Sequence, residues 1–530
     1  MTLLAKLSEC LDRPAVVAPV VLVIGYIIYQ LFLKPSVLPK QLDIIGAKKG
    51  DWFPTLQAKW RNTKDFKAAL RIADAEFRDR PGILPLLGVP NLVLLPRGDI
   101  QFVQEQPENV LNMHVQTMES LQTDYTSPDP ELIHNPVHNK LITTTLTNQT
   151  GNLVPDMVEE TAYGFEKLWG TDTEYKDVCV YDTLRRVIGL VTNRVFVGNP
   201  LCRNEEMLEL SMQYAQAVPA AGFFLVSLPK PIHWLVARAT SIPLRRLAKR
   251  YEKYIRPEIE ARLSAYDASR REDLEKKPAG ERNDFLQWSI AQAKESGDPY
   301  HWKVESLAGR ILLLNFASIH TSSFSITHVV LDLAASKQEY VDELRAEIKS
   351  VLAEHGGQWN KRALAKMEKL DSLMRESSRM NSFVTVGLMR RVVAKGGITT
   401  PSGVTIPCGA SVCVPAWQVL HDETVYPDAE TFKPFRFAEQ RKDDSVEYVK
   451  RANKAWATAS NEFLAFGHGR NACPGRFFAT NELKLMLGYL VMNYDIEIKE
   501  GTRPRNNWYS LNRVPSFDAT VRIKRRVAKA

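Results

Sequence analysis

One cysteine in this 530-residue chain stands in a context that suits a ligand atom. Cys473 lies in the run Phe-Gly-His-Gly-Arg-Asn-Ala-Cys-Pro-Gly-Arg-Phe-Phe, and an apolar segment, residues 477–492, follows at once. That segment predicts a helix, and Pro474 suits its first position because the missing N–H is not needed there. The helix start would lower the pKa of the cysteine and favour a thiolate. Glycines at positions 467, 469 and 475 would let backbone approach a large, flat group.

A second stretch with polar chemistry interrupts a long apolar segment, residues 307–335. Its order is Ala317-Ser-Ile-His-Thr-Ser322. One interpretation is a buried helix whose hydroxyls bond their own carbonyls. The other is a catalytic one, in which the Thr321 hydroxyl holds a water and passes protons, and His320, which titrates near neutrality, shuttles them.

Two charged motifs lie between these stretches. Glu376-Ser-Ser-Arg379 is an acid–base pair spaced three residues apart on a predicted helix, and Arg436 stands in the run Phe-Lys-Pro-Phe-Arg-Phe. On a surface such a pair is common and weak. In a core, each charge would need its partner, since an unpaired buried charge is costly.

In this order, the four motifs resemble those of the cytochrome P450 family, and the cysteine run looks most like its fungal members. The resemblance implies that Cys473 is the axial ligand of haem iron, with Phe466, Gly469 and Gly475 at the other signature positions. It assigns oxygen activation to Ala317, Thr321 and His320. It makes Glu376, Arg379 and Arg436 a buried cluster that fixes the cysteine loop.

The chain departs from the family pattern where haem propionates are bound. Asn471 stands where the family usually has Arg or His, so either Arg470 or another cation would serve the propionate. The usual Trp-x-x-x-Arg segment is absent. Residues 135–147 are the expected equivalent, with His138 and Lys140 as candidates.

The remaining pattern predicts a mainly α fold with a small β-sheet portion, the cytochrome P450 fold, preceded by one transmembrane helix. Residues 65–77 read as an amphipathic helix, and two short apolar runs near residues 83–95 read as a hairpin. Residues 101–373 are expected to be mostly helical, and residues 384–414 rich in strands.

The N-terminal segment predicts a membrane anchor. Residues 15–33 are almost wholly apolar, long enough to cross a bilayer, and lack a cleavage site. Lysines are more frequent after this segment than before it, which places the following chain in the cytosol. We therefore expect a lumenal segment at 1–14, the anchor at 15–33, a Pro-containing linker at 34–41 and a catalytic domain at 42–530, on the endoplasmic reticulum. A buried core helix is the alternative.

The composition limits the classes of binding partner that we expect for this protein. The net charge of +8 has no dense basic run, so it suits an anionic membrane or an acidic protein and gives no support for nucleic-acid binding. Six cysteines without disulfide spacing fit a reducing compartment. No dinucleotide fingerprint follows Cys473, so the resemblance implies a separate NADPH-cytochrome P450 reductase, with cytochrome b5 as a second candidate donor.

The resemblance implies a haem-thiolate monooxygenase that uses O2 to oxidise a lipophilic small molecule. The wording of the motifs is similar to ent-kaurene-oxidase-like members, which suggests a terpenoid or related fungal secondary metabolite. Two alternatives stay open: a haem-thiolate isomerase or dehydratase that needs no reductase, and a non-catalytic membrane haem protein. Residues 109–126 and 384–388 and Ala317 are expected to line the pocket. Residues 214–234 would form a roof whose part 223–228 either enters the membrane or packs in the core.

Overall fold

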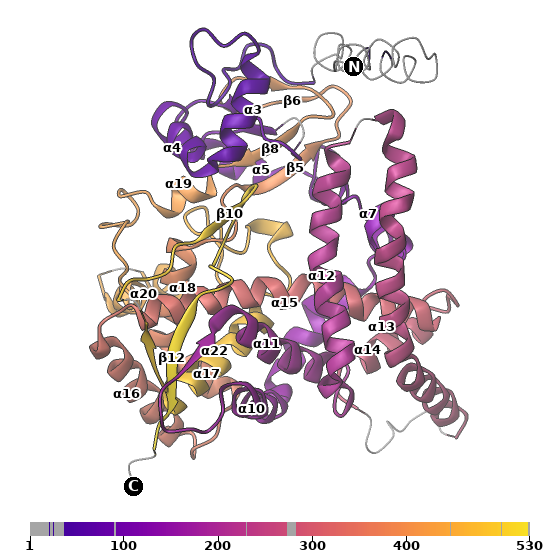
Figure 1. The fold of residues 1–530 in the computed structure, drawn as a ribbon, viewed down its shortest axis with the longest axis vertical. Coiled ribbons are helices and arrows are strands. Elements are labelled where there is room, and N and C mark those ends of the chain that lie inside the picture. The colour runs from indigo at the N-terminus through magenta and orange to yellow at the C-terminus, as the bar shows by residue number, and fades with distance from the viewer. Residues whose placement is uncertain are drawn as a thin grey trace, which may run out of the picture.

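Helices make up most of the chain in the computed structural model, and small sheets lie at its margins (Figure 1). The structure describes residues 37–527 except 90–91, 229, 273–281, 446 and 500, and before them only Val21 and Gly25.

The largest sheet combines segments far apart in the chain. Its strand order is β1-β2-β8-β5-β3, and β2 and β8 run parallel while the other neighbours are antiparallel. The strands are β1 (Gly82–Ile83), β2 (Leu92–Leu94), β3 (Leu111–Asn112), β5 (Gly387–Val392) and β8 (Ser411–Val414). Helices α3 (Pro54–Lys64) and α4 (Phe66–Glu76) lie beside it in Figure 1. Asp65 caps the start of α4, where its carboxylate accepts the Ala68 N–H, and the helix buries Phe66 and Leu70.

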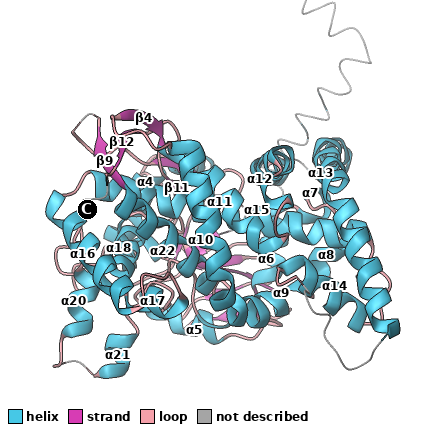
Figure 2. Ribbon diagram, turned by 90° about the horizontal axis from the view of Figure 1, so that it is seen from below, coloured by secondary structure: helices cyan, strands magenta, loops and turns pink. Residues whose placement is uncertain are grey.

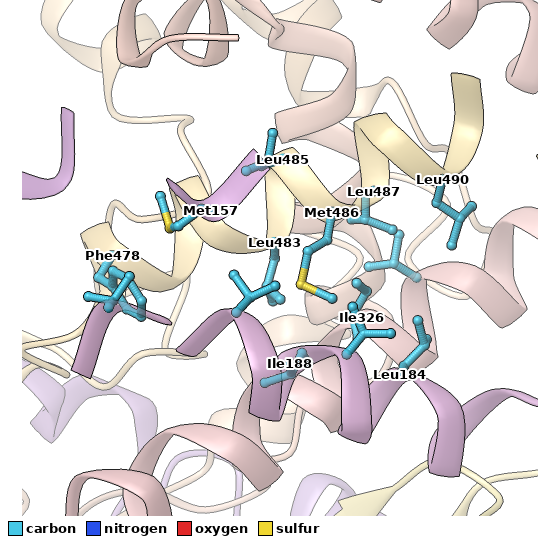
Figure 3. Close-up of a cluster of buried hydrophobic side chains, with 14 of the residues drawn as sticks. Met157, Leu184, Ile188, Ile326, Phe478, Leu483, Leu485, Met486, Leu487 and Leu490 are labelled. Atoms are coloured by element: carbon cyan, nitrogen blue, oxygen red, sulfur yellow. The ribbon is translucent and has the colours of Figure 1, made fainter. Parts of the chain in front are cut away.

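Helix α15 (Val304–Ala334) runs through the middle of the molecule, and three other helices share its core. These are α10 (Thr147–Trp169), α11 (Val180–Phe196) and α22 (Arg476–Asn493). Figure 3 shows how their apolar side chains interlock: Met157, Leu184, Ile188 and Ile326 lie beside Leu483, Met486 and Leu487 of α22. This packing holds α22, and with it the end of the cysteine loop, in place.

Two long helices stand side by side at one side of the molecule, α12 (Glu205–Val226) and α13 (Lys230–Glu272). Viewed from below, they lie far from the sheet formed by β4 (Lys176–Cys179), β12 (Thr520–Arg525) and β9 (Tyr494–Ile498) (Figure 2).

The other elements connect these parts. The helices are α5 (Ile100–Glu105), α6 (Met113–Leu121), α7 (Thr123–Thr126), α8 (Glu131–His134), α9 (His138–Leu141), α14 (Phe285–Glu295), α16 (Gln338–Glu354), α17 (Lys361–Lys366), α18 (Glu368–Met380), α19 (Ala416–Leu420), α20 (Arg436–Lys442) and α21 (Tyr448–Ala452). Short helical turns are η2 (Arg97–Asp99), η3 (Ile142–Leu146), η4 (Leu201–Arg203) and η5 (Gly469–Asn471). The remaining strands are β6 (Ile398–Thr399), β7 (Thr405–Ile406), β10 (Asn507–Tyr509) and β11 (Asn512–Val514).

The structure confirms the helical body with small sheets, the helix near 65–77, the hairpin and the strand-rich patch. It corrects one detail, because α22 begins at Arg476 and Pro474 therefore precedes the helix. Apart from Val21 and Gly25, the expected anchor lies outside the described residues, and the proposed domain limits stay a prediction. Among the helices that the structure describes, none is both long and apolar enough to cross a membrane.

Candidate active site

The cysteine loop is held in shape by its own backbone. The Cys473 N–H donates to the Phe466 carbonyl at 2.8 Å, and the Ala472 N–H donates to the Gly469 carbonyl at 3.1 Å. Gly469 has a φ of +72°, and a Cβ there would lie 2.5 Å from Cγ of Gln104. Glycine is therefore required at this position both by the backbone conformation and by the close approach of α5.

The Cys473 thiol is exposed at the surface of this loop. The backbone amides of Gly475 and Arg476 face the sulfur and lower the pKa of the thiol, but the surrounding protein atoms have a larger effect and raise it above the usual value of 9.0. The expectation of a lowered pKa is thus wrong for the polypeptide alone. The sulfur accepts hydrogen bonds from these two amides, and the residue is still exposed.

Helix α15 has an open strip in the middle of an otherwise buried sequence. Ala317 and Thr321, one turn apart, are exposed, whereas Ile319 and Ser322 beside them are buried. The Thr321 hydroxyl donates to the carbonyls of Ala317 at 2.9 Å and Ser318 at 3.2 Å. A core helix that leaves only one strip uncovered presents that strip to a space within the protein.

His320 points elsewhere. Its Nδ1 lies 2.9 Å from the Tyr181 hydroxyl on α11, and burial lowers its pKa to about 4, so the imidazole is neutral near pH 7. The structure therefore does not bring His320 together with Thr321 on the open strip, because consecutive residues of a helix lie on different faces. Its role in proton transfer stays a prediction.

A cavity of about 40 Å³ separates α15 from the cysteine loop. The rings of Phe324, Phe383, Trp456 and Phe466 line it, together with polar side chains that include Ser325, His328 and Ser378. Phe466 belongs to the cysteine loop and Phe324 to α15, two residues beyond the Ala317–Ser322 motif, so the cysteine loop and the next turn of α15 border one space.

The structure brings Glu376, Arg379 and Arg436 together in the core. The Glu376 carboxylate accepts from Arg379 Nε at 2.8 Å and Nη2 at 2.9 Å, and from Arg436 Nε at 3.2 Å. Arg436 also donates to the carbonyls of Pro427, Asp428 and Thr431, in the segment that leads towards the cysteine loop. The two guanidiniums therefore share one carboxylate and join α18 to that segment.

Two residues that the sequence reading missed strengthen the same connection. The buried Arg375 guanidinium lies 3.8 Å from the centre of the Phe463 ring, and it donates to the Thr458 carbonyl at 2.9 Å. Trp456 Nε1 donates to the Ser378 hydroxyl at 2.8 Å. Its ring packs edge to face against the Phe466 ring, with 4.9 Å between the ring centroids. Arg375 lies four residues before Arg379 on the same helix, which was the available sequence signal.

The residues that the sequence suggests as ligands of the haem propionates lie in different surroundings. Asn471 donates to the Glu108 carboxylate at 2.7 Å, and Arg470 and Lys140 are exposed. His138 is buried with Nδ1 unpartnered among the described residues, and burial, with the charge of Arg310, lowers its pKa to about 4.

Arg390 is a better candidate that the sequence reading missed. It is 5% exposed, its side chain donates to the neighbouring Met389 carbonyl, and among the described residues it forms no ion pair. Burial lowers its pKa, while the Glu108 charge opposes this effect. A register shift in β5 and a φ of +48° at Leu388 set the direction of the strand just before it. A buried guanidinium without a bound carboxylate suits an anionic group such as a propionate.

These residues fit a haem. A flat, anionic, iron-bearing group requires a ligand atom, open space and a cation. The exposed Cys473 thiol offers the ligand atom, and the open strip of α15 and Gly475, where an added Cβ would have no atom within 4 Å, offer the space. Arg390, which has no ion pair among the described residues, offers the cation. Cys473 would hold the iron, Gly469 and Gly475 would let the loop approach the ring, and Arg390 would meet a propionate.

Comparison with known proteins gives the same assignment. The cytochrome P450 family model matches residues 130–515. Cytochrome P450 monooxygenase 71 of Postia placenta is 35% identical over 423 residues, 78% of this chain and 80% of that protein. Cytochrome P450 monooxygenase gloP of Glarea lozoyensis is 30% identical over 491 residues (90% and 89%), and pbrC of Penicillium brasilianum is 28% identical over 521 residues (97% and 96%). With haem as its cofactor, this chain belongs to the cytochrome P450 family and is a monooxygenase.

Proposed function

We propose that this monooxygenase oxidises a lipophilic small molecule, with a terpenoid or related fungal secondary metabolite as the substrate class, using electrons from NADPH through a separate reductase. The observation that carries the proposal is the open strip of α15, where Ala317 and Thr321 are uncovered while Ile319 and Ser322 beside them are buried.

When bound, haem supplies the oxidation chemistry with dioxygen. The polypeptide provides the surroundings. Ala317 is small and leaves room on the open strip of α15. The Thr321 oxygen keeps lone pairs free to accept a hydrogen bond from water while its proton bonds the Ala317 carbonyl. Such a water could donate a proton from its place at the Thr321 hydroxyl, as the resemblance implies for this threonine.

Apolar residues support a lipophilic substrate. Helix α6 packs against both β5 and α12, so the expected lining segments 109–126 and 384–388 are neighbours. At the adjoining ends of α12 and α13, Phe223, Phe224, Trp234 and Leu235 are each 44–59% exposed, while Leu225 is buried. This exposed apolar edge suits contact with a lipid surface from which an apolar substrate enters.

The location is also a proposal: a single-pass anchor at 15–33 in the endoplasmic reticulum, with the catalytic part in the cytosol. Trp52 and Trp60, near α3, are 88% and 63% exposed and would lie with the α12–α13 edge against the bilayer. Protease treatment of intact microsomes tests this: an N-terminal tag should be protected and a C-terminal tag cleaved. The opposite pattern would refute it.

Reconstitution tests the reaction. The full-length protein with NADPH-cytochrome P450 reductase and labelled ¹⁸O2 should give a product that carries one labelled oxygen, and only when NADPH is present. A product that forms without NADPH would instead support an isomerase or dehydratase. Cytochrome b5 is added as a separate arm.

The Thr321→Ala variant tests proton delivery. It should consume oxygen with less product per NADPH, because it loses the hydroxyl, whereas Thr321→Ser keeps the hydroxyl and should stay close to the wild type. Equal coupling in Thr321→Ala and the wild type would remove this role.

A further inference from the structure

His328 lies on the same face of α15 as Thr321, because seven residues make almost two turns of an α-helix. Its side chain is buried, with 3% of its surface exposed, and it lines the cavity between α15 and the cysteine loop. Neither the oxygen-activating motif nor the cysteine motif contains it. It is therefore an ionisable group at the haem site with no assigned role.

One ring nitrogen of His328 is fixed as an acceptor. Its Nδ1 lies 3.0 Å from Nη2 of Arg503. A guanidinium has only donors, so Nδ1 must accept, and the ring proton of the neutral imidazole is then on Nε2. Burial, which is the largest effect, and the charge of Arg503 both lower the pKa of His328 well below 6.5, so the ring is neutral.

Arg503 is itself held firmly. It forms an ion pair with the buried Asp332 and donates to Asn506 Oδ1 at 2.8 Å. Asp332 also accepts from Ser377 Oγ at 2.5 Å and from Asn381 Nδ2 at 2.9 Å. These contacts hold the Arg503 guanidinium in place beside Nδ1 of His328.

The Nε2–H of His328 has no hydrogen-bond partner among the described residues. Three serine hydroxyls line the same cavity. That of Ser382 already donates to the carbonyl of Val384 and accepts from its N–H. The other two each make a single hydrogen bond among the described residues and have a lone pair to spare. Ser325 Oγ donates to the Thr321 carbonyl at 3.0 Å, and Ser378 Oγ accepts from Trp456 Nε1 at 2.8 Å. A buried donor left without a partner is destabilising, so these groups need one.

A water has the size and the hydrogen-bonding groups to satisfy these side chains. The cavity volume of about 40 Å³ exceeds the roughly 10–15 Å³ that one water requires, and buried waters usually make about three hydrogen bonds. An apolar ligand atom would leave the Nε2–H unpaired.

We propose that this cavity holds an ordered water that accepts from Nε2–H of His328 and donates to the hydroxyl oxygens of Ser325 and Ser378. His328 is thus a positioning residue: it keeps a water beside Ser325, one helical turn from Thr321. This second part rests on the proposed proton delivery by Thr321.

The tautomer is tested first, on the apoprotein. With ¹⁵N-histidine labelling, the His328 resonances, assigned by their absence from His328→Gln, should show a protonated Nε2 and an unprotonated Nδ1. A crystal structure of the wild-type holoenzyme should then show a water at hydrogen-bond distance from Nε2. A protonated Nδ1, or a haem edge in place of the water, would overturn the proposal.

Matched variants test the positioning role in the reconstituted enzyme. His328→Leu removes the donor and should lower product per NADPH by about tenfold, the lower end for loss of an outer hydrogen-bond partner. His328→Gln keeps an N–H and should retain most of the coupling. If His328→Leu couples like the wild type while Thr321→Ala does not, the positioning role is wrong and the proposed function stands. If neither variant is uncoupled, the positioning role of His328 and the proton delivery by Thr321 both fail. Should His328→Leu not fold, the tautomer, the wild-type water and His328→Gln still decide the question.

Discussion

Replacing Glu376 with glutamine should destabilise the protein strongly, because one buried carboxylate serves two arginines. Glu376 and Arg379 have no exposed surface, and Arg436 has 6%. Glutamine has nearly the same size but offers one acceptor oxygen in place of two and carries no charge. Arg379 and Arg436 would then be buried side by side without a counterion, and an amide N–H would face one of them.

The expected cost is about 3–5 kcal/mol, which is the range for breaking a buried ion pair by removing one partner. We expect the upper part of this range, since the carboxylate also accepts the Lys433 backbone N–H at 3.1 Å. Folded domains are stable by only about 5–15 kcal/mol, so the loss is a large fraction of the total.

The assay is denaturant unfolding of the apoprotein followed by tryptophan fluorescence, with haem retention of the holoenzyme as a second measurement. The matched control is Glu354→Gln, which breaks the Glu354–Lys366 pair at 2.9 Å, where both side chains are more than half exposed. Because solvent screens that pair, it should contribute little to stability. If the two variants unfold at the same denaturant concentration, the inference that the buried cluster supports the cysteine loop is wrong.

Three further outcomes are expected. Burial raises the pKa of Glu482 to about 7 from its usual 4.5. The contribution of this neutral acid to the free energy of unfolding is therefore fully present below about pH 4.5. About 3 kcal/mol of it is lost as the pH rises from there through 7. Glu482→Gln should remove this fall in the unfolding midpoint; a wild-type midpoint that stays level between about pH 5 and pH 8 would contradict it. Gly469→Ala should lower the free energy of unfolding of the apoprotein by about 1–2 kcal/mol, because a left-handed φ of +72° disfavours a side chain. Gly475→Ala, with open space around the added Cβ, should leave it unchanged. Equal unfolding of the two variants would refute the strain argument. Cys473→Ala should lose the thiolate absorption spectrum of the reduced, CO-bound protein, and an unchanged spectrum would exclude Cys473 as the ligand.

The sequence by itself determined the family, the cofactor and the helices that bear the main motifs. The cysteine run, the hydroxyl-bearing stretch in α15 and the Glu-x-x-Arg pair are short, and their residue types and spacing are set by local chemistry. The amphipathic pattern of α4 and the long apolar segments of α15 and α22 also placed these helices close to their observed limits. The Glu376–Arg379 pair was visible because its members are one turn apart on one helix.

Only the tertiary structure decided what each side chain meets. His320 and Thr321 are neighbours in the chain, yet the first bonds Tyr181, 139 residues away, and the second remains on the open strip. The tautomer of His328 depends on Arg503, 175 residues later, and Arg390 is a propionate candidate only because burial leaves it without a bound carboxylate. Periodicity states which residues share a face of a helix or strand. Which distant segment covers that face, and therefore whether a charge is paired, buried or open, is set by the packing of the whole chain.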